Sequence, residues 1–162
     1  MKKLLFFLSF LISLHSFSQK TEKLALRKYK IATLSDSLKE TSGLTFLKDK
    51  LYTLNDGGNT NEIFEIDKNS GKILSKLKTD FPNKDWEAMT SDGENFYIGD
   101  FGNNAGNRRD LAIYKNDFQG NYSKNSFTYS AQNDFSTRYL SHNYDAEAMI
   151  FLNEKIHVFS KE

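Results

Sequence analysis

Acidic residues recur at matching positions in three segments of the chain, and they are the side chains best suited to do chemistry. The segments read ETSGLTF from residue 40, DWEAMTS from residue 85 and DAEAMIF from residue 145. Written under one another, they form two polar columns: Glu40, Asp85 and Asp145, then Ser42, Glu87 and Glu147. If the three segments fold alike, these carboxylates converge and form one binding face.

A further polar column comes from the stretches that follow each segment. LYTLND (51–56), NFYIGD (95–100) and IHVFSK (156–161) align Asp56 with Asp100 and with Lys161. Carboxylate and amide oxygens suit a hard cation such as Ca²⁺, which takes six to eight oxygen ligands. The candidate metal ligands are therefore Asp56, Asp100, Asn55, Asn59 and Asn103.

A structural interpretation of the same residues stays open. An aspartate that follows a strand often forms a turn, because its side chain accepts hydrogen bonds from the backbone two residues on. DGGN (56–59) and DFGN (100–103) fit that role as well. The spacing of an EF-hand calcium loop is absent.

Other kinds of catalytic site have less support. No G-x-S-x-G nucleophile motif occurs, and His142 and His157 lie apart, one in a Tyr-rich loop and one in a strand pattern. Asp85 and Glu87 could share acid–base work in a hydrolase. Arg108 and Arg109 could bind a phosphate, or could pair with nearby carboxylates.

The elements that carry these residues are predicted to be strands. Short runs alternate apolar and polar residues, and Gly, Asn and Asp clusters separate them, which is typical of consecutive β-hairpins. Phe and Tyr together number 22, and the chain has a single proline, Pro82. Trp86, the only tryptophan, is expected to pack between sheets rather than to bind a ligand.

The hairpins repeat at intervals of 45 and then 60 residues, and a repeat of that length with four strands is typical of a β-propeller blade. We predict an all-β fold of about two and a half blades: residues 40–79, 85–131 and 145–162. In the segment 20–39, residues 26–34 are predicted to form the outer strand that closes the ring. An ordinary β-sandwich is the alternative.

The N-terminus and the charge balance bear on location and partners. Residues 1–19 combine two lysines, an apolar core from Leu4 to Leu14 and a polar end, as secretory signal peptides do, so we expect export to the periplasm, the cell surface or the medium. Without them, 20 basic and 21 acidic residues remain, which gives no electrostatic footprint for nucleic acid. The absence of cysteine excludes disulfides and thiolate metal sites.

The repeated motifs resemble those of a known bacterial group. TSGLTF (41–46), NDGGN (55–59), DWEAM (85–89) and YIGDFGNN (97–104) are similar to marks of secreted propellers of the Bacteroidetes type, which are related to SdiA-regulated and esterase-like phytase propellers. The resemblance covers residues 40–161. It implies a ring of more blades than the two and a half predicted here. We therefore expect this chain to be part of a longer protein, or a second chain to supply the missing blades.

Two functions follow as expectations. The first is a binding or interaction module for a small molecule, a polymer or a protein, with its face formed by Glu40, Asp85, Glu87, Asp145, Glu147, Arg108 and Arg109. The second is a cation-dependent hydrolase of phosphoesters or esters with its site at the centre of the ring. Nucleic-acid binding and stable membrane insertion are not expected.

Overall fold

The computed structural model describes residues 23–137, 139 and 141–161, and the predicted signal peptide, 1–19, lies outside them. The chain divides into two compact units, residues 1–30 and 31–162, and the second holds all the strands. No helix in the described ranges is long and apolar enough to cross a membrane. The fold is mostly β, as predicted, and its sheets are antiparallel and open.

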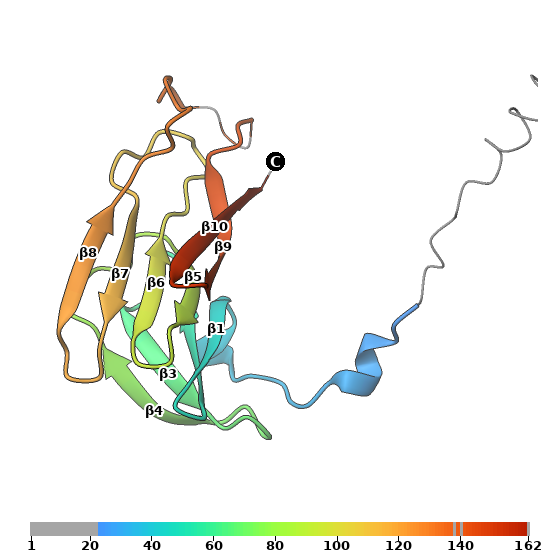
Figure 1. Ribbon diagram of the computed structural model, residues 1–162. Coiled ribbons are helices and arrows are strands. Elements are labelled where there is room, and N and C mark those ends of the chain that lie inside the picture. The colour runs from blue at the N-terminus through green and yellow to red at the C-terminus, as the bar shows by residue number, and fades with distance from the viewer. Residues whose placement is uncertain (1–22, 138, 140, 162) are drawn as a thin grey trace, which may run out of the picture. The chain divides into compact units, whose positions relative to one another are not determined.

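Three sheets follow one another along the chain (Figure 1). Sheet 1 has the order β1-β2-β3-β4, with bounds Thr41–Leu47, Lys50–Asn55, Glu62–Ile66 and Ile73–Lys78. Sheet 2 has the order β5-β6-β7-β8, with bounds Trp86–Ser91, Phe96–Asp100, Ala112–Asn116 and Tyr122–Ser126. Hairpin 3 pairs β9 with β10, with bounds Asp145–Leu152 and Lys155–Lys161.

Two-residue turns fix the register of the first pair of strands in sheet 1 and in hairpin 3. Lys48 and Asp49 have φ of 49° and 61°, and Asn153 and Glu154 have φ of 51° and 60°. Positive φ at both central residues is the turn that matches the right-handed twist of paired strands. The register of each hairpin is therefore set locally.

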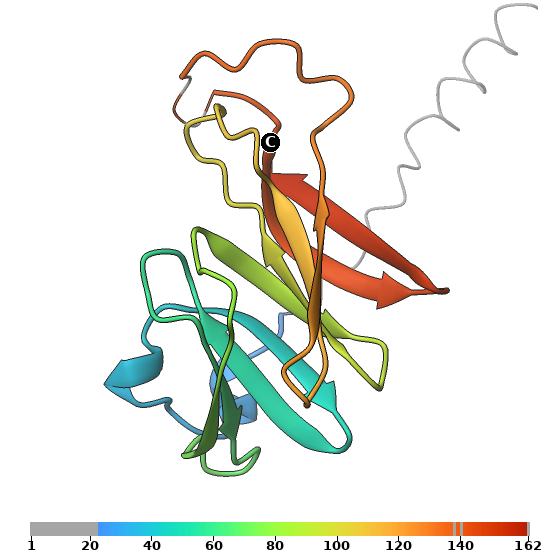
Figure 2. The ribbon, with the colours of Figure 1, turned by 90° about the vertical axis from the view of Figure 1, so that its left-hand side faces the viewer.

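The sheets pack face to face, with sheet 2 between the other two (Figure 2). Apolar side chains of sheets 1 and 2 form one core cluster, which includes Leu54, Trp86, Met89 and Ile98. Trp86 is fully buried there, as predicted, and its indole N–H donates to the carbonyl of Pro82 at 3.1 Å. A second cluster joins sheet 2 to hairpin 3 and includes Ala88, Phe101, Ala146 and Met149.

A third cluster covers the outer part of sheet 1. Leu38, in the short 3₁₀ helix η2 (Asp36–Leu38), packs with Leu34 on Phe64 and Ile66. This segment leaves β1 uncovered on the same side of the sheet, where Leu44 is 57% exposed.

Two predicted strands are wrong. Residues 26–34 form no strand; they contain the 3₁₀ helix η1 (Leu26–Tyr29), and residues 30–34 have no regular secondary structure. A strand needs a neighbouring backbone to receive its hydrogen bonds, and the alternation of this segment supplies none. The alternating run SFTYSA (126–131) predicts the fourth strand of sheet 2, but that strand is β8. Asp117 closes a tight turn before it by accepting from the amides of Gln119 and Asn121 at 2.8 and 2.9 Å.

The first strand of each sheet carries a β-bulge at the same position of the repeat. The pairing skips one residue between Thr41 and Gly43, between Trp86 and Ala88, and between Ala146 and Ala148. The skipped residues are Ser42, Glu87 and Glu147, which are the members of the second polar column. A bulge redirects the side chain of the extra residue, so the repeat sets all three apart from the regular alternation of their strands.

Candidate functional site

Three carboxylates meet where β5 begins and β2 ends. Asp56 follows β2, Asp85 precedes β5, and Glu87 is the bulged residue of β5; one oxygen of each lies within 4.8 Å of the others. Asp85 and Glu87 come from the polar columns of the sequence, and Asp56 comes from the predicted metal ligands. The structure therefore brings together residues that are 29 to 31 positions apart in the chain.

Glu87 is the most isolated of the three. Its exposed fraction is 7%, and among the described residues none donates a hydrogen bond to its carboxylate or forms an ion pair with it. Burial, together with the negative charges of Asp56, Glu147 and Asp85, raises the pKa of Glu87 to about 8. Without a cation nearby, this side chain therefore holds its proton at neutral pH.

Asp85 is perturbed in the same direction. Burial raises its pKa, the positive charge of Arg108 opposes that shift, and the neighbouring carboxylates of Asp56, Asp100 and Asp145 reinforce it. Two carboxylates that both resist ionisation mark a place where added positive charge would be stabilised.

Two glycines leave the space that the carboxylates occupy. A Cβ at Gly102 would lie 2.4 Å from Oδ2 of Asp85 and 2.4 Å from Oε1 of Glu87. A Cβ at Gly57 would lie 2.3 Å from Oδ1 of Asp85. Asp85 thus lies between the backbones of two loops, one after β2 and one after β6. Neither glycine was among the predicted site residues; the sequence signal for both is their shared position, two residues after the second strand of the repeat.

The acidic residues of hairpin 3 have a cation of their own. Lys161, at the end of β10, lies 3.0 Å from Oδ2 of Asp145 and pairs with Oε1 of Glu147. The other oxygen of Asp145 accepts from the amide of Asn103 at 2.6 Å. These carboxylates are neutralised in place and also tie the loop after β6 to hairpin 3.

Asp100 does not join the cluster, and its alignment with Asp56 is wrong by one residue. Backbone pairing places Asn55 opposite Thr41 and Asp100 opposite Trp86, so Asp100 is equivalent to Asn55. A shift of one residue turns a side chain to the other face of its sheet. Asp100 is buried and accepts from Nη2 of Arg108 at 2.8 Å, whereas Asp56 reaches Asp85 and Glu87.

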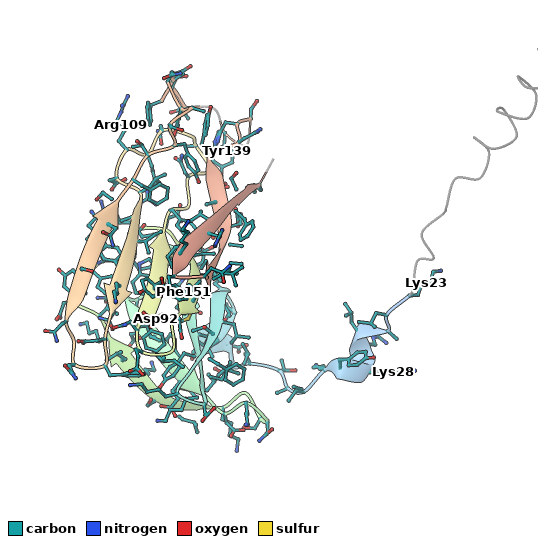
Figure 3. The ribbon with its side chains drawn as sticks, in the orientation of Figure 1. Lys23, Lys28, Asp92, Arg109, Tyr139 and Phe151 are labelled. Atoms are coloured by element: carbon teal, nitrogen blue, oxygen red, sulfur yellow. The ribbon has the colours of Figure 1, made fainter. Side chains whose placement is uncertain are left out.

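Arg108 serves this loop rather than an open binding face. Its Nη1 donates to the carbonyl of Gly102 at 2.8 Å and its Nε to Asp110 at 3.2 Å, in addition to the bond with Asp100. Arg109 points elsewhere, with its guanidinium 3.7 Å from the ring centre of Phe135. Figure 3 shows Arg109 and Asp92 at opposite ends of sheet 2.

The remaining predicted ligands hold loops in shape. The amide nitrogen of Asn55 donates to Ser37, that of Asn59 to Glu40 at 2.7 Å, and that of Asn103 to Tyr144. Asn103 also accepts, through its side-chain oxygen, from the amide of Arg108 at 2.9 Å. Glu40 is exposed and lies outside the cluster of Asp56, Asp85 and Glu87.

Comparison with known proteins adds no identification. No family model matches the chain, and no curated protein matches it either.

Proposed function

We propose that sheets 1 and 2 and hairpin 3 are blades of a β-propeller, of the secreted bacterial kind that the sequence resembles. Propeller blades are antiparallel four-stranded sheets arranged around an axis. Three features support this proposal: the strands of each sheet follow chain order, β5 contacts both β1 and β9, and the bulge recurs at one position of every first strand.

The proposed function is that of a binding module, and its site is the cluster of Asp56, Asp85 and Glu87. The observation that carries this is Glu87, a side chain that is 7% exposed and has no hydrogen-bond or ion-pair partner among the described residues, beside two other carboxylates. Leaving a buried charged group unpaired is costly, so such a group either keeps its proton or is matched by a cation. A divalent cation with a preference for oxygen ligands, such as Ca²⁺, fits this set of donors.

A calcium titration tests this function. The purified chain is stripped with EDTA, and its melting temperature and binding heat are measured with calcium chloride and with magnesium chloride at pH 7. We expect calcium to raise the melting temperature and to release protons, because Glu87 must ionise to bind. The release is measured as a dependence of the heat on the ionisation enthalpy of the buffer.

Matched variants locate the effect. Glu87→Gln and Asp85→Asn should abolish the response to calcium, whereas Glu94→Gln, which removes an exposed carboxylate far along the β5–β6 turn, should leave it unchanged. No response of the unsubstituted chain at millimolar calcium, or an equal response of all variants, would exclude the cluster as a cation site.

A hydrolase is the second candidate, and the raised pKa of Glu87 is the observation that favours it. A carboxyl group with a pKa near 8 is protonated at neutral pH and could act as a general acid. Binding ranks first because Arg108, the basic side chain whose charge acts on Asp85, is already paired with Asp100 and Asp110. Turnover of p-nitrophenyl phosphate or acetate that is lost in Glu87→Gln would reverse this ranking.

Export belongs to the same proposal. Residues 1–19 have the layout of a secretory signal peptide, so the site would operate in the periplasm, at the cell surface or outside the cell. Calcium is abundant in such compartments relative to the cytosol. A dissociation constant of about 10⁻⁴ to 10⁻³ M, which is typical of extracellular calcium-binding modules, would suffice there.

A further inference from the structure

The contacts between the sheets follow a repeating pair of small and large residues. The equivalent small residues are Gly43, Ala88 and Ala148, and the residue after each is large: Leu44, Met89 and Met149. In the first contact, a Cβ on Gly43 would lie 2.8 Å from the backbone nitrogen of Met89 and 3.0 Å from its side chain. In the second contact, Ala88 and Met149 belong to one buried cluster. Each small residue therefore packs with the large residue of the next sheet.

Among the described residues, one small and one large member of this series lack a counterpart on another sheet. Ala148 is exposed on hairpin 3, and Leu44 is 57% exposed on sheet 1. Most of their neighbours on the same faces are apolar as well. The open face of hairpin 3 is formed by Ala148, Ile150, Leu152, His157 and Phe159, all of them exposed. The open face of sheet 1 is formed by Leu44 and by Phe46, which is 56% exposed.

An aromatic contact joins sheet 2 to hairpin 3. Tyr97 stacks on Phe151 with ring centres 5.5 Å apart and planes inclined by 16° (Figure 3 labels Phe151). By strand register, His157 is equivalent to Tyr97, and Phe46 is equivalent to Phe151. The two open faces therefore hold the two halves of a second such contact.

The two faces cannot meet within one chain, because sheet 2 lies between them (Figure 2). On sheet 1, the segment of Leu34 and Leu38 packs on the other strands and leaves the face of β1 open, where Leu44 and Phe46 are exposed. Exposed apolar faces of this kind mark interaction sites, and here the complementary surface is already on the molecule.

We propose that the open face of hairpin 3 binds the open face of sheet 1 in a second copy of this chain. The contact continues, between molecules, the packing that sheets 1 and 2 and hairpin 3 make within one. It is a head-to-tail interface, in which different surfaces meet, so repeated association gives a ring or a chain of copies rather than a closed symmetric dimer. It does not depend on the cation site.

Sedimentation velocity of the purified chain between 10 and 100 μM tests this assembly. The unsubstituted chain should sediment as species larger than a monomer, in a concentration-dependent way. Ile150→Lys and Phe46→Lys each introduce a charge into one of the two faces, and each should weaken association by about 100-fold or more. Because both side chains are exposed in the monomer, the melting temperature of each variant should change little.

A mixture of the two variants gives the sharpest outcome. Ile150→Lys keeps the face on sheet 1 and Phe46→Lys keeps the face on hairpin 3, so together they should form a one-to-one pair that grows no further. Leu74→Lys, at an exposed leucine of the outer strand β4, is the matched control and should assemble like the unsubstituted chain. A monomeric unsubstituted chain, single variants that still assemble, or a mixture that stays monomeric would each overturn the proposal.

Discussion

The hydroxyl of Ser42 donates a hydrogen bond of 2.8 Å to the main-chain carbonyl of Trp86. Ser42 is the bulged residue of β1, and Trp86 immediately precedes Glu87, the bulged residue of β5. The bond therefore joins the irregular positions of two neighbouring sheets and fixes the backbone from which Glu87 projects. In the repeat, serine stands in sheet 1 where the other sheets have glutamate.

Replacing Ser42 with alanine should lower the free energy of unfolding by about 1 kcal/mol, because one partly buried hydrogen bond is lost and the carbonyl of Trp86 is left without that donor. Urea denaturation measures this change. Ser123→Ala, on the exposed strand β8, is the control and should have an effect near zero. Equal effects of both substitutions would mean that the bond between the bulges does not contribute to stability.

Replacing Glu87 with glutamine should change how stability depends on pH. The folded chain holds a proton on Glu87 up to about pH 8, whereas the unfolded chain releases it near 4.5. Stability is therefore greatest below the unfolded pKa and falls as the pH rises toward 8. The variant lacks this pH-dependent loss. Its free energy of unfolding should therefore exceed that of the unsubstituted chain by on the order of 2 kcal/mol at pH 8, and the two should hardly differ at pH 4.5.

The measurement is the difference in unfolding free energy between the two proteins, without added metal, from pH 4.5 to 8.5. Taking the difference removes the contributions of the other carboxylates, several of which have lowered pKa values and act in the opposite direction. A difference that does not vary with pH would show that Glu87 ionises normally in the folded chain.

Replacing Gly102 with alanine should be severely destabilising, by about 2 kcal/mol or more, because the new Cβ overlaps the carboxylates of Asp85 and Glu87 and forces them apart. Thermal unfolding measures the loss, and the response to calcium should disappear with it. Gly93→Ala is the comparison, because Gly93 has a φ of 93° and open space around it. An alanine there meets no atoms, so only its unfavourable backbone conformation lowers the free energy of unfolding, by about 1 kcal/mol.

Replacing Asp92 with asparagine should weaken the β5–β6 turn. Burial alone would raise the pKa of Asp92, but bonds from the amides of Asn95 and Glu94 and from the hydroxyl of Tyr97 lower it to about 2. The stabilisation is present above the unfolded pKa near 3.8 and is lost as the pH falls toward 2. We expect a loss of about 1–2 kcal/mol at pH 7 that disappears at pH 2.

Chemical denaturation at both pH values checks this prediction. Glu94→Gln, in the same turn but exposed, provides the comparison and should behave like the unsubstituted chain. A loss in Asp92→Asn that persists unchanged at pH 2 would assign the effect to side-chain packing rather than to the charged hydrogen bonds.

The sequence by itself determined the local parts of this structure. Alternating runs and two-residue turns such as Lys48-Asp49 specify each hairpin from neighbouring residues alone, and the repeat of DWEAM and DAEAM aligned the first strands correctly. The two polar columns that contain Asp85 and Glu87 were visible for the same reason. These features depend on backbone preferences within a few residues, which a linear pattern retains.

Only the tertiary structure decided which carboxylates meet. Asp56 and Asp100 follow similar letters, yet the pairing of each strand with its partner offsets them by one residue and sends their side chains to different neighbours. Three features arise only from the folded packing: the isolation of Glu87, the ion pair of Asp100 with Arg108, and the ion pair of Asp145 with Lys161. Charge and burial at such contacts depend on long-range packing, and no local pattern records it.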